Sequence, residues 1–427
     1  MAARIIHVPR RFVSHEWGGT ETVITEIARQ QKQADFEPRI ITSMALAHEA
    51  HEIIQGIEVQ RHRHCYPFFG LTDAEKAALD KKGGNLLSLP LFGALMREQD
   101  VRLFHAHSLK RLGGMVATAA RLRRKPLVVS LHGGVFDVPA EEMQTMIQPI
   151  SGKFEWGRLF GAVFRSRQLL DDADMIICVG QSELEAAQKK LQHNRIDYLP
   201  NGVESHRFTQ GEGARFRAAH GIPQDAFLVM NISRIDAQKN QMVLVNAFSD
   251  LAKEDASGHL VLIGPETQPD YAAKLRARIA ELGLATRIHL LPGLRNDDPA
   301  LLDAYQACNV FVLPSMHEPF GIVVLEAWSA GKPVIASHVG GLKTLINHQR
   351  DGLFFHDEAD LTAALRELKA HPERCLALGQ AGQMEARTHY DWKRIHQRLE
   401  TLYQQAEEHH NGRYRSVSAP TYSTRHV

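Results

Sequence analysis

The feature that most constrains the fold is a repeated alternation of short apolar runs with helical stretches. In the second half of the chain the apolar runs are Phe227–Ile232, Leu260–Ile263, Ile288–Leu291, Val310–Leu313, Pro333–Ala336 and Gly352–Phe355. Short apolar runs of this kind are typical of buried strands, and helices between consecutive strands are the crossovers of a parallel sheet. The pattern therefore predicts an α/β protein with a doubly wound parallel sheet.

The first half of the chain shows the same rhythm. Its expected strands are Arg4–Val8, Arg39–Thr42, Val59–His62, Val101–Ala106, Leu127–Leu131, Asp174–Val179 and Arg195–Leu199. A length of 427 residues exceeds the size at which single cores usually stop growing. Two domains, each with its own doubly wound sheet and with the ligand in the cleft between them, are the simplest architecture.

Composition excludes several classes of function. There are 50 basic and 49 acidic residues, and this balance gives no overall field for binding a nucleic acid. The four cysteines form no C-x-x-C pair, which indicates reduced thiols in a cytoplasmic protein. No run reaches about 18 apolar residues, and the N-terminus passes directly into a strand-like run. Although 24 histidines are present, there is no HExxH and no Cys/His ligand set, so we expect no metal site.

The stretch HEPFGIVVLEAW places two carboxylates beside a helix start. Glu318 follows the run Val310–Leu313, so it is expected just beyond the carboxyl end of a strand, where open α/β sheets bind ligands. Glu326 comes eight positions later, and this spacing predicts both acids on roughly the same side of the intervening helix. Phe320 and Gly321 stand at the start of that helix, where free N–H groups suit a phosphate. A helix cap and a solvated helix face are the alternative.

Two glycine-bearing turns of the first half are further candidates for ligand contact. Gly18, Gly19 and Thr20 open a helical stripe after the first strand, so their N–H groups can approach a phosphate closely, with a tight turn as the alternative. His132 ends the strand Leu127–Leu131 beside a glycine pair. A histidine at that edge can meet a ligand, although a lone histidine is more often structural.

Two cations follow the first strand of the second half. Arg234 stands at the strand end and Lys239 at the start of the next helix. A guanidinium fork and a compact ammonium in this place can bind a diphosphate together. In isolation, a surface loop explains the two basic residues equally well.

In their order along the chain, these elements resemble the retaining glycosyltransferases of family 4, which have the GT-B fold of two Rossmann-like domains. The resemblance extends from Gly18 to about Phe355. It implies that the glycine loop contacts the donor diphosphate and that Arg234 and Lys239 stabilise the leaving group. It further implies sugar contacts for His132 and Glu318 and ribose contacts for Glu326. Other implied donor contacts are Thr20, Gly264, Phe320, Gly321 and, in the loop that lines the nucleobase, Leu294 and Arg295.

The resemblance also places the domain boundary. The Pro200-Asn201-Gly202-Val203 turn is similar to the family's crossover to the second domain. We therefore expect an N-terminal domain at 1–200, a nucleotide-sugar-binding domain at 201–390, a helix at 391–409 returning to the first domain, and a disordered tail at 410–427.

Departures from the family pattern lie on the acceptor side, where Thr20 and Glu21 follow the glycines and an unusual segment fills residues 65–100. Residues 65–100 are broken helical sequence, which fits either an acceptor-side excursion or a helical pair covering the sheet. A long helix is expected at Glu141–Leu170, where basic and aromatic residues alternate. It would contact an acceptor or an anionic membrane surface, or else be a partly buried helix with a solvated basic face. Near the diphosphate, Ser233 stands where glycine is usual.

The resulting hypothesis is a metal-independent retaining transferase without a cofactor. It would move a sugar, from a UDP-sugar in preference to a GDP-sugar, to a hydroxyl of a sugar, glycan or glycolipid. The acceptor proton would leave through the diphosphate oxygen on the same face. The alternatives are a sugar-nucleotide epimerase or a catalytically silent nucleotide-sugar-binding protein. We expect a cytoplasmic location, with peripheral contact at the inner face of the membrane left open; the sequence does not indicate the oligomeric state.

Overall fold

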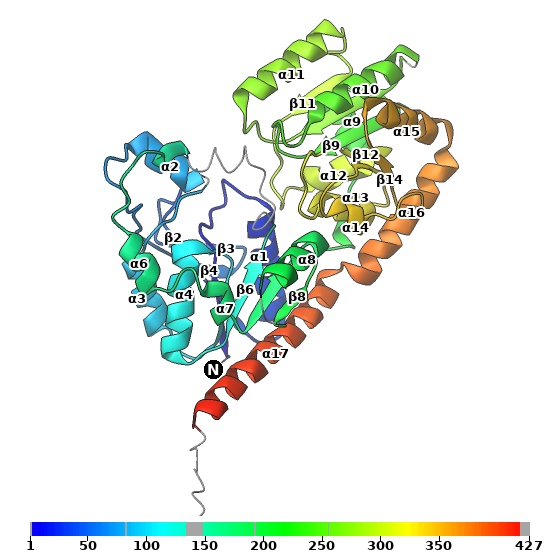
Figure 1. Cartoon of the computed structure of the whole chain (residues 1–427). Helices are drawn as coiled ribbons and strands as arrows, with labels where there is room; N and C mark the ends of the chain where they lie inside the picture. The colour runs from blue at the N-terminus through cyan, green and yellow to red at the C-terminus, as the bar shows by residue number, and fades with distance from the viewer. Residues whose placement is uncertain (1, 82, 134–147, 192–193, 255, 419–427) are drawn as a thin grey trace, which may run out of the picture. The chain divides into compact units, whose positions relative to one another are not determined.

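The computed structural model describes residues 2–81, 83–133, 148–191, 194–254 and 256–418. The chain forms two compact units, one of Met1–Leu199 with His396–Val427 and the other of Pro200–Ile395 (Figure 1). Each unit contains its own sheet with helices around it. The predicted α/β class, with a mainly parallel sheet in each half, is confirmed.

Within the described residues, the sheet of the first unit has eight strands in the order β3-β4-β2-β1-β5-β6-β7-β8. All neighbouring pairs are parallel except β3 with β4. The order reverses at β1, which lies between β2 and β5. The strands are β1 (Arg4–Val8), β2 (Glu37–Ser43), β3 (His51–Ile54), β4 (Ile57–His62), β5 (Val101–Ala106), β6 (Leu127–Leu131), β7 (Met175–Cys178) and β8 (Ile196–Tyr198).

Side chains of the central strands alternate between two packed faces. Ile6 on β1 and Phe104 on β5 enter a large core together with helices α3 (Leu89–Arg97) and α4 (Lys110–Arg123). The intervening positions, His7 and His105, are fully buried on the other side, against helices α1 (Gly19–Gln33) and α17 (Trp392–Ser418). The helices of this unit are α1 (Gly19–Gln33), α2 (Asp73–Lys81), α3 (Leu89–Arg97), α4 (Lys110–Arg123), α6 (Arg158–Val163), α7 (Leu169–Asp172), α8 (Gln181–Lys190) and α17 (Trp392–Ser418).

The second unit has a six-stranded parallel sheet in the order β11-β10-β9-β12-β13-β14, again counting only described residues. Alternate residues of each strand enter two separate cores, as Met230 and Val229 on β9 do. Its strands are β9 (Leu228–Ile232), β10 (His259–Ile263), β11 (Ile288–Leu291), β12 (Val310–Leu313), β13 (Val334–Ser337) and β14 (Leu353–Phe355). Its helices are α9 (Gly213–Ala219), α10 (Gln241–Glu254), α11 (Pro269–Glu281), α12 (Pro299–Ala307), α13 (Ile322–Ser329), α14 (Leu342–Leu345), α15 (Glu358–Ala370) and α16 (Pro372–His389).

Two expectations about helices are wrong. The long helix expected at Glu141–Leu170 is absent from its described part, residues 148–170. That part holds a short 3₁₀ turn, α6 and the start of α7, and Gly152 has a φ of +71° that no helix accommodates. The tail expected from residue 410 is helical up to Ser418, because α17 continues; residues 419–427 lie outside the described part.

The other structural expectations concern the C-terminal helix and the segment 65–100. Helix α17 begins in the second unit at Trp392 and belongs to the first unit from His396 onward. Residues 65–100 contain helices α2 and α3, of which α3 packs on α4 through buried Leu91 and Leu95. Across the described residues, no helix combines the length and apolar character needed to cross a membrane.

Candidate active site

A lysine and a glutamate meet where the strand order of the second sheet reverses. Lys239 follows β9 and Glu318 follows β12, the neighbouring strand. The Nζ atom of Lys239 lies 2.5 Å from Oε2 of Glu318, and both side chains are largely buried. Ser315 donates a second hydrogen bond to the same carboxylate oxygen at 3.3 Å. An ion pair at the carboxyl ends of adjacent parallel strands occupies the place where such sheets bind ligands.

Arg234 lies in the same loop as Lys239 and is more accessible. Its side chain is 45% exposed and pairs with Asp236 at 3.0 Å, while its second terminal nitrogen donates to Gln238 at 3.1 Å. Asp236 also accepts from the backbone N–H of Lys239 at 3.0 Å. Asp236 therefore ties the side chain of Arg234 to the backbone of Lys239 and so fixes the loop that carries both residues.

Glu326 has a different partner and a different environment. It lies on α13, and the hydroxyl of Tyr305 on α12 donates to its Oε2 at 2.5 Å. Burial raises the pKa of Glu326 above its ordinary value, and the Tyr305 hydrogen bond opposes that effect. The helical spacing argument for the two acids is wrong, because α13 begins only at Ile322 and Glu318 lies in the preceding loop.

Two glycines permit the close approach of chain segments around these acids. Gly321 caps α13 with a φ of +98°, a left-handed conformation that disfavours other residues. A Cβ atom on Gly264, at the end of β10, would collide with the carbonyl oxygen of Ser233. Phe320 is buried in the core beside α13, so its side chain supports the loop from inside.

The loop after β11 presents Leu294 and Arg295. Leu294 packs partly on the core, whereas Arg295 is exposed and pairs with Asp297 at 2.9 Å. Arg207 donates to the backbone carbonyl of Asn296 in this loop. The predicted donor residues of the second unit thus all lie on segments that follow β9, β10, β11 and β12.

The glycine loop of the first unit begins helix α1. Gly18 is the N-cap residue, with an extended φ of −139°, and its N–H donates to the side chain of Glu21 at 3.1 Å. Gly18 and Gly19 are exposed, and Thr20 is half-buried. The extended φ of Gly18 is open to any residue, so a tight turn does not require glycine there. A Cβ atom on Gly18 would lie 3.2 Å from Oε2 of Glu21, and the missing side chain therefore leaves room for that cap.

His132 is half-buried and ends a chain of hydrogen-bonded histidines that sequence reasoning missed, in which His107 and His7 are buried. Its Nε2 lies 2.9 Å from Nδ1 of His107, whose Nε2 lies 3.0 Å from Nδ1 of His7. Nε2 of His7 lies 2.8 Å from the amide oxygen of Gln31. Burial lowers the pKa of His7 and of His132 to about 4, so both are neutral at pH 7. The alternating residues of β1 and β5 were the available signal, since they place His7 and His105 on one face.

Among the described residues, His7, His105 and His107 are the group whose nitrogens lie close enough to hold a metal ion, within 4.8 Å of one another. Their ring nitrogens are already engaged. His105 contacts the hydroxyl of Tyr403 at 2.8 Å and that of Ser130 at 2.7 Å, and both nitrogens of His7 and His107 are hydrogen bonded. A saturated hydrogen-bond network therefore describes this group better than a metal site does.

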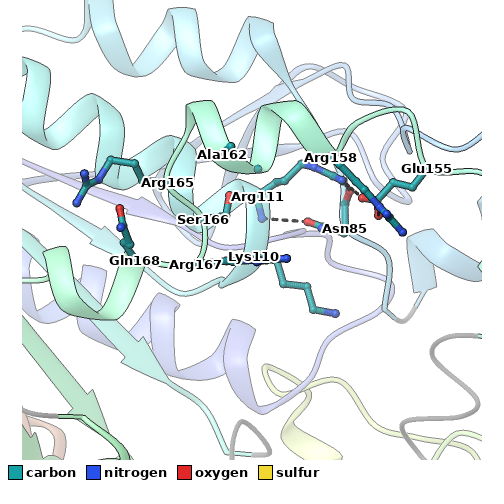
Figure 2. A pocket seen from close by; sticks show the side chains of 11 residues that line it. Asn85, Lys110, Arg111, Glu155, Arg158, Ala162, Arg165, Ser166, Arg167 and Gln168 are labelled. Carbon is teal, nitrogen blue, oxygen red and sulfur yellow. Dashed lines mark hydrogen bonds and ion pairs between the residues drawn. The ribbon is translucent and has the colours of Figure 1, made fainter.

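A basic pocket of ≈ 960 Å³ lies in the first unit (Figure 2). Figure 2 shows Glu155 and Arg158 at one side of it and Arg165 at the other. Within the described part of the chain, neither Lys110 nor Arg167 has an ion-pair or hydrogen-bond partner for its charged group. The pocket is lined by Asn85, Lys110, Arg111, Glu155, Arg158, Gly161, Ala162, Arg165, Ser166, Arg167 and Gln168.

This pocket adjoins the histidine chain. A smaller hollow of ≈ 240 Å³ shares Asn85 and Lys110 with it and is also lined by His107. Burial and the neighbouring charge of Arg10 lower the pKa of Lys110. The hydroxyl of Ser166 is buried without a hydrogen-bond partner among the described residues. Lys110, whose ammonium has no ion-pair partner among the described residues, thus lines both the basic pocket and the hollow that reaches His107.

Comparisons with known proteins give the class to which this fold and site belong. The chain matches the family models "Glycosyltransferase Family 4" over residues 17–207 and "Glycosyl transferases group 1" over residues 213–385. The D-inositol 3-phosphate glycosyltransferase 1 of Catenulispora acidiphila is 29% identical over 93% of both chains. The D-inositol 3-phosphate glycosyltransferase of Salinispora tropica is 28% identical over 93% of this chain and 83% of its own.

Solved structures agree on the fold. Anabaena HepE, solved with UDP and glucose, superposes with a TM-score of 0.69 at 20% identity and covers 93% of this chain and 98% of its own. Sucrose-phosphate synthase from Thermosynechococcus elongatus gives 0.72 at 22% identity, covering 95% and 99%. The protein is a glycosyltransferase with the GT-B fold. It belongs to glycosyltransferase family 4, as the motifs around Glu318 and Arg234 predicted.

Proposed function

We propose that the protein transfers a sugar from a UDP-sugar to an acceptor hydroxyl with retention of configuration. The observation that carries the proposal is the Lys239–Glu318 pair with Arg234 beside it, at the reversal point of the second sheet. Cations suit the diphosphate, and a carboxylate suits the hydroxyls of the sugar bonded to it. UDP is favoured over GDP in part because HepE, which shares the fold, was solved with UDP.

The reaction separates a cation-like sugar from a diphosphate, so its barrier depends on stabilising the leaving group. The bond between the anomeric carbon and the diphosphate oxygen breaks, and the acceptor oxygen bonds to the same face of that carbon. The acceptor proton passes to the departing diphosphate oxygen. Arg234 and Lys239 balance the developing charge, Glu318 and His132 orient the sugar, and Glu326 accepts from the ribose hydroxyls. Gly19, at the start of α1, supplies an exposed backbone N–H group from the first unit, whereas the N–H of Gly18 is bonded to Glu21 in the free protein.

The same arrangement supports chemistry without a metal ion or a cofactor. Two fixed cations perform the charge stabilisation that a divalent ion performs elsewhere. The expected result is full transfer activity after exhaustive treatment with EDTA. Activity that disappears on chelation and returns with magnesium would contradict this part of the proposal.

The basic pocket supports an acceptor that carries an anionic group. Lys110 and Arg167 line this pocket without a partner for their charges among the described residues, and Lys110 also lines the hollow that reaches His107. An anionic group of the acceptor would neutralise their charge. The curated relatives are named for an inositol phosphate. We therefore favour a phosphorylated sugar or polyol, or the glycolipid that bears one, as the acceptor.

Peripheral membrane contact is a second proposal for the first unit and rests on a separate observation. Phe69, Phe154 and Leu159 are 62%, 70% and 71% exposed, and Phe69 stacks on Phe154 at 5.9 Å. Arg158 lies beside them on α6. A cytoplasmic protein that docks on the inner membrane face should sediment with anionic vesicles and not with neutral ones. Phe154→Ser should abolish this sedimentation.

The deciding experiment measures donor turnover by the full chain. UDP-sugars and GDP-sugars are incubated with myo-inositol 3-phosphate and, separately, with myo-inositol, and the anomeric configuration of the product is read by NMR. Retention with a UDP-sugar and a preference for the phosphorylated acceptor are expected. Binding without transfer or hydrolysis would indicate a silent nucleotide-sugar-binding protein, and conversion of the donor itself would indicate an epimerase.

A further inference from the structure

The hydrogen bonds that connect His132 through His107 and His7 to Gln31 all run in the same direction from donor to acceptor. The far end of this chain is Gln31 on α1, which is fully buried. The amide oxygen of Gln31 faces Nε2 of His7, and its amide nitrogen donates to the hydroxyl of Tyr403 at 3.1 Å. An amide oxygen accepts hydrogen bonds and cannot donate them. The proton between Gln31 and His7 therefore belongs to His7.

That single assignment fixes every ring along the chain. A neutral imidazole carries one proton, so His7 with a proton on Nε2 has a lone pair on Nδ1. Nδ1 of His7 must then accept from Nε2 of His107, 3.0 Å away. Nδ1 of His107 must in turn accept from Nε2 of His132, 2.9 Å away. The three rings have the same tautomer, and each bond has one donor and one acceptor.

The second branch of the network is consistent with this direction. The hydroxyl oxygen of Tyr403 accepts a hydrogen bond from the amide nitrogen of Gln31, and the hydroxyl donates to Nδ1 of His105 at 2.8 Å. Nε2 of His105 then donates to the hydroxyl of Ser130 at 2.7 Å. Tyr403 thereby holds the Gln31 amide in the orientation that presents its oxygen to His7.

We infer that Gln31, His7 and His107 are positioning residues that hold His132 as the Nε2–H tautomer, with the lone pair of its Nδ1 directed away from the network as a hydrogen-bond acceptor. Within the described residues, nothing bonds that Nδ1. The inference rests on the proposed function for its consequence: His132 accepts a hydrogen bond from a hydroxyl of the donor sugar and does not donate one to it.

The first test reads the tautomer directly. Long-range ¹H–¹⁵N correlation spectra of the full-length protein labelled on histidine, with peaks assigned through His132→Gln and His7→Gln, distinguish the two ring nitrogens. The expected result is a protonated Nε2 and an unprotonated Nδ1 at His132. A protonated Nδ1 would show that the chain runs in the opposite direction and would overturn the inference. Because this measurement needs no substrate, its failure is distinguishable from failure of the proposed function.

The second test uses variants of Gln31. Gln31→Met removes the fixed acceptor while keeping the volume, so His132 should show a mixture of tautomers and kcat should fall about tenfold. Gln31→Glu restores an acceptor at the same place and should return the single tautomer and most of the rate. Thr25→Val is the matched control, because Thr25 is buried on the same helix and donates only to its own helix, to the Glu21 carbonyl.

A structural role alone predicts a different outcome. In that case Gln31→Met and Thr25→Val would lower stability alike, the His132 spectrum would not change, and Gln31→Glu would bring no recovery. Single-tautomer spectra in Gln31→Met would likewise contradict the inference, even if the variant had lost activity.

Discussion

The ammonium of Lys239 already has a carboxylate partner in the ligand-free chain, and this pairing determines what a substitution should do. Lys239→Ala removes a cation from the proposed leaving-group site, so kcat should fall by about 10²-fold. Steady-state kinetics together with thermal unfolding provide the measurement. The unpaired Glu318 should cost some stability, but much less than the loss in rate.

A control for Lys239 lies on the following helix. Lys253 is 71% exposed and pairs with Asp250 at 2.7 Å. Lys253→Ala removes an equal charge from the same unit and should leave kcat unchanged, because exposed pairs contribute little. Equal kinetics for Lys239→Ala and the wild type would exclude Lys239 from the reaction.

At the residue scale, the sequence indicated which residues are candidates for the site better than it indicated their hydrogen-bond partners. Arg234, Lys239 and Glu318 could be selected because each follows a strand of a parallel sheet and because their order along the chain resembles the family pattern. The partner of Glu326 could not be selected from the sequence, because Tyr305 belongs to a helix whose position depends on packing in the core of the second unit. The histidine chain was equally inaccessible, since Gln31 and Tyr403 are 372 positions apart.

At the scale of elements, the buried faces of β1 and β5 make the first unit sensitive to acid. The pKa of His7 and of His132 is about 4 in the folded protein, against 6.5 for an exposed histidine. As the pH falls below about 6.5, these histidines bind protons in the unfolded protein but not in the folded one. The free energy of unfolding therefore decreases until the pH reaches the pKa of the folded state.

The urea midpoint of unfolding should accordingly drop steeply between pH 7 and pH 5. His7→Gln should reduce that dependence, whereas replacing the exposed His51 with Gln should preserve it. A midpoint that stays constant over this range would show that these histidines take up protons equally in the folded and unfolded states, so that burial does not lower their pKa.

Strand prediction succeeded for short runs that are mainly apolar and buried or half-buried throughout. The bounds of β1, β5, β6, β11 and β12 match the expected runs. β3 was missed because it is a half-exposed edge strand with the sequence HEII. The helix prediction failed over residues 148–170 because it relied on composition, which favours a helix there. Gly152 and Arg165 have positive φ angles, and these interrupt the helix in the described chain.

Across the whole molecule, Arg102 ties the C-terminal helix to the first sheet. It contacts Glu400 at 2.5 Å and Glu407 at 2.8 Å, and the arginine side chain is 12% exposed. Arg102→Ala leaves two neighbouring carboxylates without their cation and should lower the free energy of unfolding by about 2 kcal/mol. Denaturant titration measures this.

The exposed pair of Arg398 with Asp197 serves as the comparison on the same helix, since Arg398 is 46% exposed. Arg398→Ala should change the free energy of unfolding by less than about 1 kcal/mol. Similar losses in both variants would show that helix content, and not the buried charge cluster, accounts for the effect of Arg102.

Nucleotide binding should stabilise the protein selectively. A ligand that binds only the folded state at 100 times its Kd adds about 2.7 kcal/mol. In a thermal-shift panel at equal concentration, UDP and UDP-sugars should raise Tm more than GDP and GDP-sugars. A larger shift with GDP would reverse the proposed donor preference.

The first unit is built from both ends of the chain, and this determines the order in which the two units can complete folding during synthesis. Residues 200–395 are continuous, so that unit can close its two cores while the chain is still emerging from the ribosome. The first unit cannot be completed then, because Arg102, His105 and Gln31 await Glu400 and Tyr403. The part of the enzyme that is synthesised first is finished last, and a premature stop near the C-terminus damages the fold at the opposite end of the sequence.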